Sequence, residues 1–127
     1  MIANFMSKMK GLIHMDEKME EYASILEENI KEHGVVLETV VAMEECAELI
    51  QAISKVKRYG FVGEYKDNLI EEIADVSIVI REIMMIFGLS VGDINEVIDS
   101  KIQRIKKRLD KTEYTTYFGS DGSVWKM

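Results

Sequence analysis

Two long apolar segments each carry three carboxylates within little more than one helical turn, and this pattern limits the folds that the chain can adopt. The first segment is Val41–Lys57 and the second is Asn68–Phe87. The carboxylates are Glu44, Glu45 and Glu48 in the first segment and Glu71, Glu72 and Asp75 in the second. At about 100° per residue, each set falls on one side of a helix, inside a stripe that apolar residues continue above and below. We therefore expect the two sets to face each other across a partly buried interface between helices.

The rest of the sequence also favours helices. Proline is absent, and the residues between the glycines are mainly Glu, Lys, Leu, Ile, Met and Ala, which have high helix propensity. We predict an all-α fold that resembles a four-helix bundle, with helices at about 16–32, 36–58, 65–87 and 91–111. Residues 1–127 form a single domain in this prediction, with an N-terminal arm at 1–14 and a C-terminal hairpin or extended arm at 113–127.

Small residues mark the predicted helix boundaries. Gly34 follows the first helix and suits a left-handed C-cap, and a loop at 59–64 contains two glycines. Ser90 precedes the fourth helix and is followed three residues later by Asp93, the spacing of a capping box.

Charge, cysteine content and hydropathy limit the partners and the cellular location that the sequence predicts. The net charge of −7 disfavours binding to nucleic acids and to anionic membranes, which recruit basic proteins. The single cysteine, Cys46, cannot form an intrachain disulfide, and we expect it to be a buried small residue. No apolar run approaches the ~18 residues of a membrane span, and Lys8 and Lys10 interrupt any signal-peptide core. These features predict a cytoplasmic protein.

The second predicted helix is apolar on nearly all sides, which indicates an oligomer. One face carries Val36, Val40, Met43, Ala47 and Ile50, and the opposite face carries Leu37, Val41, Leu49, Ala52 and Val56. A domain of about four helices cannot cover both faces by itself. We therefore expect a homodimer or a homotetramer.

The clustered carboxylates indicate a metal site. Burying several like charges together costs several kcal/mol per ion and raises their pKa values. Neither stripe holds enough Arg or Lys to neutralise them, whereas Mg²⁺, or Mn²⁺ in its place, prefers carboxylate oxygens and also binds phosphates. A solvated acidic face is the alternative that the spacing leaves open. A di-iron bundle fits poorly because neither His14 nor His33 follows a Glu in a Glu-x-x-His pair.

The motif Glu45-x-x-Glu48 with Glu72-x-x-Asp75 resembles the ExxE…ExxD signature of the MazG-like all-α nucleoside triphosphate pyrophosphohydrolases. The resemblance covers roughly residues 35–108. It implies a Mg²⁺-dependent enzyme that cleaves a nucleoside triphosphate between its α and β phosphates, giving a monophosphate and pyrophosphate. It also implies that these four residues are the metal ligands and form the catalytic centre. Glu44 or Glu48 is a candidate to accept the proton of the attacking water, and the sequence does not choose between them.

The same resemblance implies substrate-binding residues in the fourth helix. Lys101 and Arg108 match a Lys and an Arg that hold the triphosphate in the family, and Arg104 lies on the same stripe. An ordinary basic face near a helix C-terminus is the alternative. Asn68 either contacts the substrate or caps its helix. The chain departs from the family at Ile105, where several relatives carry Asn, and it lacks the Trp-rich N-terminal segment of the dCTP-cleaving members.

Three functions are compatible with these observations. The first is a pyrophosphohydrolase that removes non-standard or excess nucleotides from the cellular pool. The second is a ribosyl-ATP pyrophosphohydrolase, which shares the chemistry and differs in the substrate. The third is a non-catalytic helical module for oligomerisation or regulation, in which the carboxylates only solvate the surface.

Overall fold

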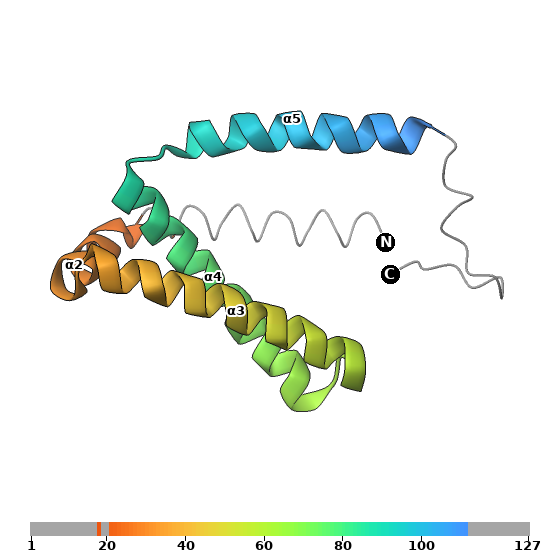
Figure 1. Cartoon of the computed structure of the whole chain (residues 1–127), viewed down its shortest axis with the longest axis horizontal. Helices are drawn as coiled ribbons and strands as arrows, with labels where there is room; N and C mark the ends of the chain where they lie inside the picture. Colours follow the sequence, from red (N-terminus) through yellow and green to blue (C-terminus); the bar gives the residue numbers. More distant parts are fainter. Residues whose placement is uncertain (1–17, 19–20, 112–127) are drawn as a thin grey trace. The chain divides into compact units, whose positions relative to one another are not determined.

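The computed structural model describes Lys18 and residues 21–111, and this part of the chain is helical without strands. Its helices are α2 (Ala23–His33), α3 (Val35–Tyr59), α4 (Gly63–Phe87) and α5 (Val91–Asp110) (Figure 1). The prediction of an all-α chain is confirmed for these residues. The predicted N-terminal arm at 1–14 and C-terminal arm at 113–127 lie outside the described residues.

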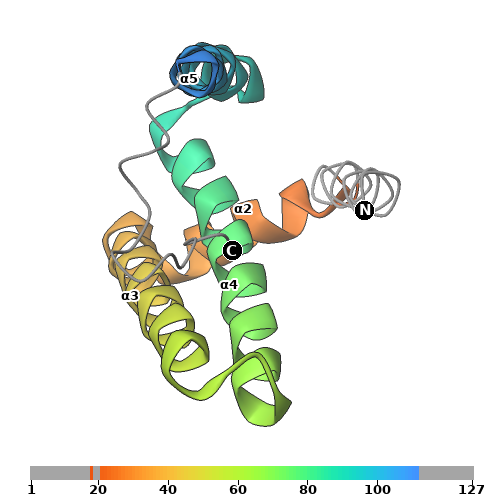
Figure 2. The same ribbon diagram turned by 90° about the vertical axis from the view of Figure 1, so that its right-hand side faces the viewer.

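Helices α3 and α4 form the centre of the first compact unit, which ends at Gly88. They run in opposite directions, are joined by residues 60–62, and pack against each other (Figures 1 and 2). Helix α2 contacts both of them. The short connection makes α3 and α4 antiparallel neighbours, so the acidic stripes of the two helices meet along one interface.

The helix boundaries agree with the predicted ones to within about two residues, apart from the start of the first helix. Helix α2 ends at His33 as predicted, and Gly34 has a positive φ of 87°. Its ψ of 150° lies outside the left-handed helical region, so the predicted left-handed cap is wrong at this position. Gly34 is also the residue before α3, and the chain must leave one helix and enter the next there. The left-handed cap occurs instead at Gly88, with φ 65° and ψ 33°.

Helix α5 belongs to a second compact unit, which begins at Leu89. Its predicted capping box is confirmed. The Asp93 backbone N–H donates to Ser90 Oγ at 3.1 Å, and the Ser90 N–H donates to Asp93 Oδ2 at 3.0 Å. The second bond is charge-assisted, and together they lower the pKa of Asp93.

The described residues enclose a small core. Ala42, Ala52 and Val79 are its buried apolar side chains, and no large side chain of the described part is fully buried. Ala42 and Ala52 show that one face of α3 is covered. The other face remains open: Val36, Val40, Met43 and Ile50 are between 44% and 81% exposed. The expected homodimer or homotetramer stays a prediction.

Cys46 corrects one expectation. The residue is exposed, whereas the sequence suggested a buried position. It lies on the open face of α3, where it lines a shallow apolar depression with Met43 and Ile50. None of the helices in the described residues combines the length and the apolar character needed to cross a membrane.

Candidate metal centre

Glu45 of α3 and Glu72 and Asp75 of α4 converge at the interface between the two helices. One carboxylate oxygen from each residue lies within 4.8 Å of the other two. Glu72 and Asp75 are three residues apart and therefore project from the same side of α4, and the antiparallel packing places Glu45 opposite them. Glu72 is only 8% exposed, and the other two are half-buried. Three of the four predicted metal ligands are thus brought together.

Two oxygens of this cluster lack partners. Glu45 Oε2 and Glu72 Oε2 are buried and have no hydrogen-bond donor among the residues that the structure describes. A buried acceptor without a donor costs about 1–3 kcal/mol, and a charged one costs more. Carboxylate oxygens that are close together and lack donors match the ligand preference of Mg²⁺ and Mn²⁺, so the residues present fit a divalent cation.

The electrostatics of the cluster also favour a cation. Burial raises the pKa of Glu45, and the charges of Asp75, Glu48 and Glu72 raise it further. Burial is likewise the main reason why the pKa of Glu72 is raised, followed by the charges of Glu48 and Asp75. A divalent cation among these groups would stabilise their ionised forms and reverse both shifts.

Asn68 supports the cluster from the preceding turn of α4. Its Nδ2 donates to Glu72 Oε1 at 3.1 Å, which lowers the pKa of Glu72 and opposes part of the shift from burial. Helix α4 begins at Gly63, so the alternative that Asn68 caps this helix is wrong. The bond holds one oxygen of Glu72, while the other, Oε2, is buried without a donor from residues 18 and 21–111.

Glu48, the fourth predicted ligand, is exposed and is not among the three converging carboxylates. It nevertheless lies close enough for its charge to raise the pKa of both Glu45 and Glu72. Glu44 and Glu71 are exposed as well. Glu48 is therefore the acidic side chain best placed between the cluster and solvent.

The basic residues predicted to bind phosphate lie on α5. Lys101, Arg104 and Arg108 are exposed, as is Ile105. This helix belongs to the second compact unit, whereas the carboxylate cluster belongs to the first. The role of Lys101, Arg104 and Arg108 in substrate binding therefore stays a prediction.

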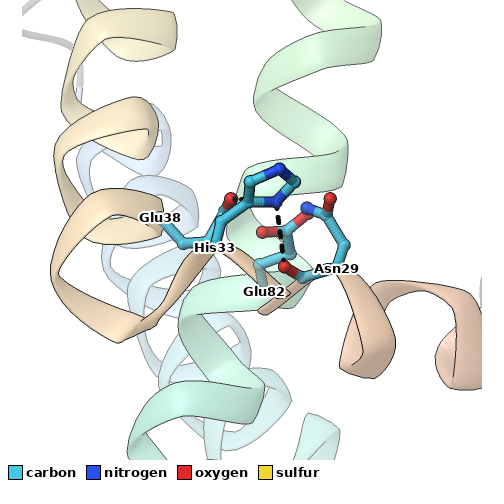
Figure 3. Close-up of polar contacts among 4 residues, drawn as sticks. All are labelled: Asn29, His33, Glu38 and Glu82. Atoms are coloured by element: carbon cyan, nitrogen blue, oxygen red, sulfur yellow. Dashed lines mark hydrogen bonds and ion pairs between the residues drawn. The ribbon is translucent and has the colours of Figure 1, made fainter. Parts of the chain in front are cut away.

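A second group of buried polar residues was missed by the sequence analysis. Glu38 of α3 and Glu82 of α4 are 6% and 4% exposed, and they meet Asn29 and His33 of α2 (Figure 3). Asn29 Nδ2 donates to Glu82 Oε1 at 3.3 Å, and His33 Nδ1 lies 3.3 Å from Glu38 Oε1 and 3.0 Å from the Asn29 carbonyl oxygen. Burial, followed by the neighbouring Glu38, raises the pKa of Glu82 to about 7.

The sequence contains a signal for this group. Glu38 precedes Glu45 by two helical turns, and Glu82 follows Asp75 by two turns, so both extend the acidic stripes by one heptad. Continuing each stripe at a spacing of seven residues would have found them.

Comparisons of the chain with models of protein families, with curated proteins and with solved structures find no match. A functional proposal must therefore be argued from the sequence motif and from the geometry of Glu45, Glu72 and Asp75.

Proposed function

We propose that this protein is a Mg²⁺-dependent nucleoside triphosphate pyrophosphohydrolase of the MazG-like type. It cleaves the α–β phosphoanhydride of nucleoside or deoxynucleoside triphosphates, giving a monophosphate and pyrophosphate, and it clears unwanted nucleotides from the pool. The observation that carries the proposal is the convergence of Glu45, Glu72 and Asp75 within 4.8 Å, with buried oxygens of Glu45 and Glu72 that have no donor in the described part of the chain.

Each acidic residue has a role in this reaction. Glu45, Glu72 and Asp75 hold the Mg²⁺ ion, for which Mn²⁺ can substitute, and Asn68 keeps Glu72 oriented through its 3.1 Å hydrogen bond. The ion supplies charge neutralisation of the phosphates and activation of a water molecule. Exposed Glu48 either completes the ligand set or accepts the proton of that water. In the proposal, Lys101, Arg104 and Arg108 bind the phosphates.

The assembly that we propose is a homodimer or a homotetramer in the cytoplasm. The support is the open apolar face of α3 together with a core of only small buried apolar side chains. A contiguous exposed apolar surface is typical of a protein–protein interface. The net charge of −7 argues against nucleic acids or anionic membranes as partners.

A panel of nucleoside triphosphates and deoxynucleoside triphosphates, assayed for pyrophosphate release with and without Mg²⁺, tests the proposal. Glu72→Gln and Asp75→Asn should abolish turnover because each removes a ligand charge, while the exposed Glu28→Gln serves as a control of equal charge change. Ribosyl-ATP is included in the panel as well. If it is hydrolysed and the other triphosphates are not, the protein is a ribosyl-ATP pyrophosphohydrolase of histidine synthesis.

The competing proposal is a helical module without catalytic activity. The exposed apolar faces favour it as much as they favour an oligomeric enzyme. If folded protein with Mg²⁺ releases no pyrophosphate from any substrate in the panel, the enzymatic proposal is rejected. The non-catalytic helical module is then the remaining proposal.

A further inference from the structure

A cavity of about 640 Å³ lies at the end of the hairpin where α3 passes into α4. This volume is within the ~300–1,000 Å³ that small-molecule sites occupy. Tyr59, Tyr65, Lys55 and Asn68 line it together with three carboxylates of α4: Glu64, Asp67 and Glu71. The cavity is formed entirely within the first compact unit.

The cavity adjoins the metal centre through Asn68. This residue lines the cavity and also donates to Glu72 Oε1 at 3.1 Å. At 1.5 Å rise per residue, the stretch from Glu64 to Asn68 lies about 6–12 Å along the helix from Glu72. A nucleotide whose phosphates are held at the metal centre extends its sugar and base over a comparable length.

The charges of the cavity determine which end of a nucleotide it can accept. Glu64, Asp67 and Glu71 give it an excess of negative charge over the single ammonium of Lys55. Phosphates are therefore repelled from it, and the uncharged nucleoside end is the part that fits.

Its aromatic residues offer a surface for a base. The rings of Tyr59 and Tyr65 are stacked, with centroids 4.9 Å apart and planes at 24°. Both residues retain exposure, Tyr59 at 56%, but the Arg58 guanidinium lies over the Tyr59 ring, 5.6 Å from its centroid. Tyr65 is therefore the ring better placed to stack on a base. Bases stack on such rings regardless of sequence because every base has a π face.

Lys55 provides a donor for a ligand. It is half-buried, and it has no ion-pair partner within 4.0 Å among the residues that the structure describes. The carboxylates provide acceptors and, when ionised, no donors. A nucleobase satisfies both kinds of group, because it carries N–H donors together with carbonyl or ring-nitrogen acceptors.

We propose that this cavity binds the nucleoside moiety of the substrate, with Tyr65, which is stacked on Tyr59, as the ring that contacts the base, an inference that rests on the proposed function. Its carboxylates accept from the N–H groups of the base, which an amino group or a ring N–H provides. Lys55 donates to an acceptor atom of the base.

Steady-state kinetics of Tyr65→Ala on the preferred triphosphate tests this assignment. Loss of a stacking contact should raise KM by about tenfold or more with little change in kcat, because the metal centre is left intact. Tyr65→Phe keeps the ring and should raise KM less than Tyr65→Ala does. Tyr22→Ala removes an exposed tyrosine that does not line the cavity and should behave as wild type.

Binding of an uncharged nucleoside, followed by NMR without metal, separates the cavity from the catalytic proposal. Cytidine should bind to the wild type, and Tyr65→Ala should weaken that binding. If Tyr65→Ala hydrolyses the triphosphate with an unchanged KM, the cavity is not the nucleoside site and the enzymatic proposal stands. If Tyr65→Ala weakens cytidine binding but no triphosphate is hydrolysed, the cavity is supported and the enzymatic proposal is overturned. An affinity for cytidine that Tyr65→Ala leaves unchanged overturns the assignment of the cavity.

Discussion

Glu82→Gln should make the stability of the protein less dependent on pH. The Glu82 side chain is 4% exposed, its Oε2 has no hydrogen-bond partner among the described residues, and Glu38 is its acidic neighbour. Burial is the largest cause of its raised pKa, and the hydrogen bond and charge of Glu38 add to it. The hydrogen bond from Asn29 and the charge of His33 oppose the shift. Gln has the shape of the protonated carboxyl and cannot ionise.

The sign and the size of the effect follow from linkage. Glu82 binds its proton more tightly in the folded state, with a pKa of about 7, than in the unfolded state, with 4.5. Its stabilising contribution is fully present below about pH 4.5 and is lost as the pH rises through about 7. At about 1.4 kcal/mol per pKa unit, the loss is at most about 3 kcal/mol.

Urea unfolding at about pH 5 and about pH 8, with a chelator present, measures this contribution. The free energy of unfolding of the wild type should fall over this window by up to about 3 kcal/mol more than that of Glu82→Gln. The raised pKa values of Glu45 and Glu72 act in the same direction, but they are common to both proteins and cancel in the difference. Glu28→Gln, an exposed control on α2, should follow the wild type. Equal pH dependence in the wild type and Glu82→Gln would refute the reasoning.

Three further predictions concern the metal, the helix cap and the assembly. Millimolar Mg²⁺ should raise the Tm of the wild type in a thermal melt, by the equivalent of about 3 kcal/mol at a hundredfold excess over Kd. The Tm of Asp75→Asn should not change with Mg²⁺. A wild-type Tm that does not respond to Mg²⁺ would count against the metal centre. Ser90→Ala removes the side-chain acceptor of the capping box and should cost about 1 kcal/mol in urea unfolding, whereas Ser90→Thr should cost less. The wild type should be at least a dimer by light scattering at micromolar concentration, and Met43→Glu, on the open face of α3, should reduce its size; a monomeric wild type would contradict the proposed assembly.

Much of the helical structure could be predicted from the sequence because local signals determine it. Apolar periodicity and glycine placed the ends of α3 and α4 within two residues, and the spacing of Ser90 and Asp93 predicted a capping box that the structure confirms. The position of Cys46 was wrong because burial depends on which face of an apolar helix has a partner. Cys46 follows buried Ala42 by one turn and lines the same depression, which Ile83 of α4 also lines, so it lies at the edge of the interface where the packing leaves it exposed. The pattern of α3 alone does not show where that edge falls.

The convergence of Glu45, Glu72 and Asp75 could also be anticipated, because acidic residues within one turn of each helix interrupt an apolar stripe. The pair of Glu38 and Glu82 has the weaker signal of a seven-residue spacing from Glu45 and Asp75. Each is a single carboxylate in its turn, and a single carboxylate on a helix is usually solvated. The packing of α2 on both helices then shows that the two side chains are buried.

The two clusters of carboxylates on this interface differ in the donors around them, and this difference predicts different ways of neutralising their charge. Beside Glu38 and Glu82, Asn29 and His33 of α2 supply nitrogen atoms, and Glu82, whose pKa burial raises to about 7, can hold a proton near neutral pH. Two helical turns away, the three carboxylates of Glu45, Glu72 and Asp75 lie together. Among the described residues their side-chain donor is Asn68, whose amide is hydrogen-bonded to Glu72. A single proton cannot neutralise three carboxylates, whereas a divalent cation removes most of their mutual repulsion. Placing an amide in the cluster, as in Asp75→Asn, should therefore stabilise the metal-free protein in urea unfolding while it removes the response to Mg²⁺. Destabilisation by Asp75→Asn without metal would show that repulsion is not what the ion relieves.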